Sequence, residues 1–160
     1  MEDVQSLNEF GTALPTTLPS PDLTAQLHSR LEDLRQTVRM RDRVQTLDVA
    51  NGLTKLAADL SAEFQVQVPY EVVMLAYYGR QLEFGLAANR LGVLRQAATD
   101  LRSMWNRTES AVEKRSVEDA RRFTDIVVTL DGARRPVDYV APTRAALAEA
   151  DHIERLFRSP

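Results

Sequence analysis

The chain has 160 residues, of which 44% are hydrophobic and 27% are charged, and its formal net charge is −3. This size and composition suit a single globular domain whose hydrophobic core needs no disulfide or structural metal. Cysteine is absent, which excludes disulfides, thiolate catalysis and cysteine-ligated zinc or iron–sulfur sites. Acidic and basic residues are interleaved along the chain, so we expect no nucleic-acid partner.

The N-terminal segment differs in composition from the rest of the chain. It lacks the basic stretch followed by an apolar stretch that is typical of a secretory signal peptide. No apolar run in the sequence reaches the ~20 residues of a membrane span. Its Thr, Pro and Ser residues at positions 12–21 are typical of the tether that often follows a membrane or lipid anchor. We therefore expect residues 1–20 to be a flexible tether, poorly ordered or packed only against a neighbour, and residues 21–160 to form one helical domain.

The first predicted hairpin consists of helices over residues 22–39 and 42–64. Ser20 is a good N-cap, with Pro21 in the first helical position and Asp22 near the positive end of the helix dipole. Two apolar stripes of helical period follow, and the second does not continue the phase of the first, which predicts a turn near residues 39–43. The stripes are Leu23, Leu27, Leu31, Leu34 and Val38, then Val49, Leu53, Leu56, Leu60 and Phe64.

The middle of the chain predicts a third helix over residues 70–88 and a fourth to about 114. Pro69 suits a helix start, and the short segment of residues 65–69 is strand-like in composition but too isolated to found a sheet. Gly79 and Gly85 are poor helix formers and indicate the close approach of a neighbouring backbone. A single kinked helix over residues 70–114 is the alternative.

The C-terminal region predicts a third hairpin. Ser116 is the N-cap of a fifth helix that ends at Asp131 and Gly132, and the last helix begins near Pro136 or Pro142. The apolar patterns of the first and last hairpins match after a shift of about 92 residues, and amphipathic helices align so readily that duplication and coincidence both stay open. We predict an all-α antiparallel helical-hairpin bundle of about five to six helices, with a short solenoid as the alternative.

Three segments carry a family resemblance: VPYEVVMLAYYGRQLEF, LRSMWNRTESAVEK and EADHIERLF. Together they resemble a group of uncharacterised bacterial all-helical proteins, many of them exported or lipid-anchored, over about residues 45–157. The resemblance implies helical hairpins and an extracytoplasmic setting, periplasmic or in the cell envelope, against a cytoplasmic alternative. It implies no known activity. The family pattern leads us to expect an acidic residue where Ala76 stands, and this departure weakens any carry-over of a polar site.

The sharpest metal hypothesis rests on two pairs of helical residues. Glu149 and His152 lie three apart and share a helix face, as do His28 and Glu32, which lie four apart. If the first and last helices touch, these four side chains form one nitrogen and oxygen site suited to zinc or another transition ion. The alternative is that all four are exposed polar residues.

A polar and aromatic cluster in the third helix is the candidate ligand site. The Arg80 guanidinium can donate several hydrogen bonds to an anionic group, and the tyrosine rings can stack against a planar ligand. The structural alternative is that Arg80 pairs with a nearby glutamate and the tyrosines are half-buried. The cluster consists of Tyr70, Glu71, Tyr77, Tyr78 and Arg80.

The sequence holds no enzymatic signature. It has no glycine-rich phosphate loop, nucleophile elbow or paired metal-ligand motif. The arginines at positions 39, 41 and 43 are interleaved with an acidic residue and have no nearby aromatic residues on which bases could stack, so they do not indicate a phosphate-binding surface. We therefore expect a non-enzymatic interaction or scaffold domain, without cofactor, that binds a protein partner or itself. A small metal-binding or ligand-binding carrier is the alternative.

Overall fold

The computed structural model describes residues 21–61 and 68–158. Its elements are six α-helices and one 3₁₀-helix, and the described residues contain no strand, which confirms the all-α prediction. The predictions for residues 1–20, including the Ser20 cap, and most of residues 65–69 lie outside the described ranges. The helices are α2 (Pro21–Met40), α3 (Arg43–Ser61), α4 (Tyr70–Ala87), α5 (Leu91–Glu113), α6 (Val117–Gly132), η1 (Pro136–Tyr139) and α7 (Val140–Arg158).

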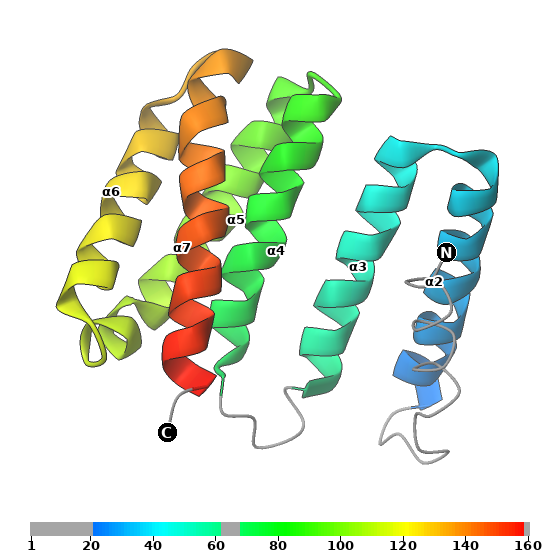
Figure 1. Ribbon diagram of the computed structural model, residues 1–160, viewed down its shortest axis with the longest axis horizontal. Helices are drawn as coiled ribbons and strands as arrows, with labels where there is room; N and C mark the ends of the chain where they lie inside the picture. The colour runs from blue at the N-terminus through cyan, green and yellow to red at the C-terminus, as the bar shows by residue number, and fades with distance from the viewer. Residues whose placement is uncertain (1–20, 62–67, 159–160) are drawn as a thin grey trace.

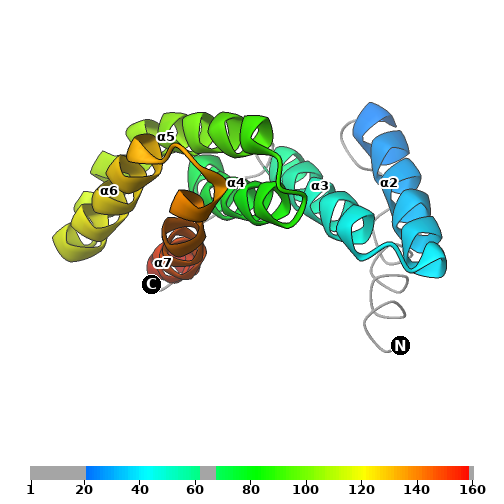
Figure 2. The ribbon, with the colours of Figure 1, turned by 90° about the horizontal axis from the view of Figure 1, so that it is seen from above.

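Helices α4 to α7 form an up-down-up-down four-helix bundle. Each of these helices packs against the next one along the chain, and α7 closes the bundle by packing against α4 (Figures 1 and 2). The connections between them are short, which forces consecutive helices to lie antiparallel and side by side. None of the described helices is long and apolar enough to span a membrane.

The main hydrophobic core lies inside this bundle. Trp105 of α5 and Phe123 of α6 are almost fully buried, with their ring centroids 4.7 Å apart. The predicted close approaches at two glycines are present, although side chains make most of the contact. A Cβ on Gly79 would lie 2.8 Å from Leu147 Cδ2 of α7, and one on Gly85 would lie 2.9 Å from Leu94 Cδ2 of α5 and 3.3 Å from its backbone nitrogen.

The α2–α3 hairpin lies outside the bundle. Helix α3 packs on α4, and α2 packs on α3, so the hairpin extends the molecule sideways (Figure 2). In the turn between them Arg41 adopts a φ of 57°, and the Asp42 carboxylate accepts a hydrogen bond from the Gln45 N–H at 3.0 Å, which caps α3. Four helices therefore form a closed bundle and two form an attached hairpin.

The other predicted boundaries are also present. Asn89 adopts a φ of 50° between α4 and α5, a conformation that ends helices, so the single kinked helix over residues 70–114 is wrong. Ser116 is the N-cap of α6 and accepts a hydrogen bond from the Asp119 N–H at 3.2 Å. Pro142 lies in the first turn of α7, where its missing N–H costs no helical hydrogen bond.

Candidate binding groove

A groove of about 690 Å³ lies between α3 and α7, over the surface of α4. Its volume falls in the range of roughly 300–1,000 Å³ that is typical of ligand sites. The lining comes from the N-terminal halves of α3 and α7 and the C-terminal half of α4. It consists of Arg43, Val44, Leu47, Asp48, Asn51, Arg80, Gln81, Glu83, Phe84, Leu86, Ala87, Val140, Thr143 and Arg144.

The groove exists because α3 and α7 both pack against α4 while making no extended contact with each other. The lining residues follow the helical period on each element: Val44, Leu47 and Asn51 on α3, and Val140 and Thr143 on α7. Residues three or four apart lie on the same helix face, so each helix presents one stripe to the groove. This stripe of α3 is a different face from the one that carries the buried Val49 and Leu56.

Apolar side chains are exposed along the walls of the groove. Leu47 is 55% exposed and Val44 is 39% exposed on the α3 side, and Val140 is 37% exposed on the α7 side. Phe84 of α4 lines the groove between them. Exposed apolar residues that cluster at a concave site mark a binding surface more often than scattered ones do.

Three arginines add positive charge to this surface. Arg43, Arg80 and Arg144 are all exposed, and none of them makes an ion pair within the described residues. Among the described residues, the Arg80 guanidinium makes a single long hydrogen bond, of 3.5 Å, to the Thr54 hydroxyl. Two carboxylates also line the groove, and one of them, Asp48, accepts a hydrogen bond from Gln81 at 3.4 Å. The unpaired guanidinium groups are therefore available to an anionic ligand.

Two buried polar atoms of groove-lining residues have no hydrogen-bond partner among the described residues: Asn51 Oδ1 and Thr143 Oγ1. Asn51 is 4% exposed and Thr143 is 1% exposed, while the Asn51 amide nitrogen donates to the Tyr77 carbonyl at 3.1 Å. Because that donation fixes the amide orientation, Oδ1 is left as an acceptor. A buried polar group without a partner costs roughly 1–3 kcal/mol of stability.

Replacing Thr143 by valine should therefore raise the free energy of unfolding by about 1 kcal/mol, because valine keeps the shape and removes the unpartnered hydroxyl. Urea denaturation measures the change. Thr37→Val is the matched control, since Thr37 is similarly buried but its hydroxyl donates to the Leu34 carbonyl at 3.0 Å, and it should not stabilise the chain. A loss of stability in Thr143→Val as large as that in Thr37→Val would contradict the assignment.

The structure does not gather the five residues of the predicted aromatic ligand site, Tyr70, Glu71, Tyr77, Tyr78 and Arg80, in this groove. Of these only Arg80 lines it. Tyr70 hydrogen-bonds Asp59 of α3, and burial together with this bond raises the pKa of Tyr70 to about 12. Burial also raises the pKa of Tyr77 and of Tyr78, whose rings meet edge to face at 5.0 Å.

The structure also separates the two pairs of the metal hypothesis. Helices α3 and α4 lie between α2, which carries His28 and Glu32, and α7, which carries Glu149 and His152 (Figures 1 and 2). Glu32 instead pairs with Arg35 and Arg39 on its own helix. Among the described residues, no three His, Asp or Glu side chains converge on a position that would hold a metal ion.

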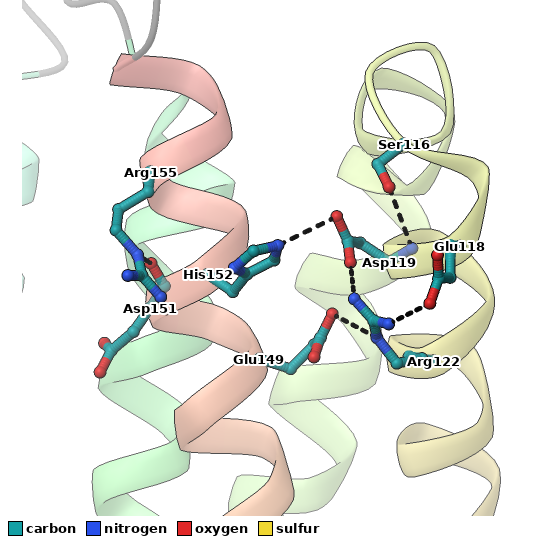
Figure 3. Close-up of polar contacts among 8 residues, drawn as sticks. All are labelled: Ser116, Glu118, Asp119, Arg122, Glu149, Asp151, His152 and Arg155. Carbon is teal, nitrogen blue, oxygen red and sulfur yellow. Dashed lines mark hydrogen bonds and ion pairs between the residues drawn. The ribbon is translucent and has the colours of Figure 1, made fainter.

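Glu149 and His152 belong instead to a polar cluster that joins α7 to α6 (Figure 3). The centre of this cluster is Asp119, which is 3% exposed and contacts both Arg122 and His152, the latter with Nε2 at 3.4 Å from Oδ2. Arg122 also pairs with Glu118 and, at 3.2 Å, with Glu149. These charged and polar groups pair with one another across the interface between α6 and α7, so the cluster stabilises the packing of the two helices.

The sequence alone did not single out the groove residues Leu47, Asn51, Thr143 and Arg144. One signal was present, since Val44 and Leu47 are apolar but fall out of phase with the stripe that buries α3. A second apolar face on an amphipathic helix indicates a second contact. Which helices flank that face depends on the tertiary arrangement.

Comparison with known proteins found no matching family model, curated protein or solved structure. The resemblance to uncharacterised bacterial helical proteins therefore rests on its sequence motifs alone. Function is therefore inferred from the groove.

Proposed function

We propose that this chain is a non-enzymatic interaction module that holds a segment of a partner protein in the groove between α3, α4 and α7. One observation carries the proposal: an open groove combines exposed apolar walls with three exposed arginines that form no ion pair with any described residue. Each of these features is unfavourable or neutral for the chain alone. Together they are favourable once a complementary segment fills the groove.

The groove chemistry supports binding over catalysis. Its lining contains no histidine, serine, lysine or cysteine, and its one hydroxyl, that of Thr143, makes no hydrogen bond to the lining carboxylates of Asp48 and Glu83. A small-ligand carrier is the second candidate, and the enclosed position of Asn51 and Thr143 favours it. Mass spectrometry of the protein under native conditions separates the two, because a carrier should retain a small ligand of defined mass.

A photocrosslinking amino acid placed at Leu47 in cells tests the interaction module. We expect one discrete adduct with another protein, since Leu47 is exposed on the groove wall. The matched control is the same crosslinker at Val117, which is 67% exposed but lies at the start of α6, outside the groove. Adding Arg80→Glu should abolish the Leu47 adduct. An adduct pattern that is the same at both sites would contradict the proposal.

The extracytoplasmic setting is a separate part of the proposal. It is supported by the resemblance and by the Thr, Pro and Ser composition of residues 12–21. Protease added to cells of the source organism, with any outer membrane permeabilised, should digest the chain while a cytoplasmic marker stays intact. Protection until the cytoplasmic membrane is broken would favour the cytoplasmic alternative.

A further inference from the structure

We infer that the segment held in the groove is an amphipathic helix whose apolar stripe is flanked by Asp or Glu. This inference rests on the proposed function and names the chemistry of the partner. It is supported by the distribution of charge and of exposed apolar side chains along the groove. Helices that lay an apolar face into a groove are a recurrent mode of peptide recognition.

The dimensions of the groove suit about two helical turns. Its lining runs from Arg43 to Asn51 on α3 and from Arg80 to Ala87 on α4, which at 1.5 Å per residue is about 10–12 Å of helix. A guest helix of this length presents anchors at positions i, i+3 or i+4, and i+7. The groove is bounded by three helices of the host, so the guest packs as a further helix against α3, α4 and α7.

The charges define the flanks of the guest helix. Arg43, Arg80 and Arg144 come from three different helices, and all three are exposed without an ion pair in the described part of the chain. The lining carboxylates are fewer, Asp48 and Glu83, and Asp48 is already hydrogen-bonded to Gln81. A guest helix with carboxylates beside its apolar stripe complements this surface, whereas a basic helix leaves like charges facing each other.

Selection from a displayed library of helical peptides, randomised on one face and panned against the full chain, tests this inference. The selected peptides are then titrated by fluorescence anisotropy against three full-chain variants. The first is Leu47→Asp, the second combines Arg43→Gln, Arg80→Gln and Arg144→Gln, and the third combines Arg95→Gln, Arg107→Gln and Arg121→Gln. All of these positions are exposed, so the variants should keep the helical circular dichroism of the parent.

We expect the selection to yield acidic amphipathic peptides. Their affinity should fall at least about tenfold with Leu47→Asp. It should also fall about tenfold at low salt with the variant that replaces the three groove arginines, as the loss of three exposed charge pairs predicts. The control triple should stay within about twofold. Peptides that bind through the groove but are neutral or basic, or that ignore the groove arginines, would overturn this inference and leave the proposed function standing. Peptides that ignore Leu47→Asp would remove both.

Discussion

Replacing Trp105 by alanine should lower the free energy of unfolding by about 3 to 5 kcal/mol, the range typical of removing a buried tryptophan. Its side chain is 2% exposed and lies at the centre of the four-helix bundle, where it contacts Phe123. The indole N–H donates to the Thr124 hydroxyl at 3.0 Å, and that hydroxyl donates to Glu109 at 2.8 Å. The substitution therefore leaves a cavity and removes the first of the two consecutive hydrogen bonds that link α5 to α6.

Chemical denaturation of the variants measures this effect. Trp105→Phe keeps part of the ring volume and loses the hydrogen bond, so its cost should be smaller than that of alanine. Val128→Ala is the surface control, because Val128 is 64% exposed on α6 and should change stability by less than about 0.5 kcal/mol. A Trp105→Ala protein as stable as the Val128→Ala protein would show that the core is not organised around this residue.

Most of the fold could be predicted from the sequence because its signals are local. Ser116 caps α6, Gly79 and Gly85 allow close approach, and Pro142 lies where a helix tolerates proline. Each signal depends on backbone chemistry within one or two turns, which the sequence displays directly. The sequence does not decide the break between α4 and α5, because this break depends on Asn89 in a left-handed conformation, which asparagine permits but does not require.

The candidate site could not be predicted because it depends on which helices become neighbours. The metal hypothesis needed α2 beside α7, whereas α2 packs on α3 outside the bundle, so His28 and Glu149 lie on separate units. The groove needed α3 and α7 to flank α4 without meeting each other. An apolar stripe specifies which face of a helix is buried but not which helix covers that face. The identity of the covering helix depends on the tertiary structure.

Replacing Asp119 by asparagine should lower the free energy of unfolding by about 2 kcal/mol at neutral pH, since hydrogen bonds to a charged group contribute roughly 1.5–3 kcal/mol. Asp119 is the buried member of the cluster that joins α6 to α7, and the substitution keeps its size while removing its charge (Figure 3). Asp125→Asn is the matched control, because Asp125 is exposed on the same helix. The Asp125 variant should have nearly the stability of the parent.

The effect of Asp119→Asn should also depend on pH in a defined direction. Burial alone would raise the pKa of Asp119, but the hydrogen bond with Ser116 and the charges of His152 and Arg122 outweigh it and lower the pKa below its usual value. A carboxyl whose pKa is lowered by folding contributes stability above its unfolded pKa of about 3.9 and loses that contribution as the pH falls through the folded value. The difference in stability between the parent and Asp119→Asn should therefore shrink as the pH falls from about 5 toward 3.

Asp138 is the main confounding group in this acid range. Its carboxylate accepts hydrogen bonds from the Arg135 side chain and from the N–H groups of Arg135 and Arg134, which lowers the pKa of Asp138 to about 2. Both proteins lose its contribution equally, so it cancels when parent and variant are compared by urea denaturation at each pH. A stability difference that stays constant down to pH 3 would show that the charge of Asp119 does not hold α6 to α7.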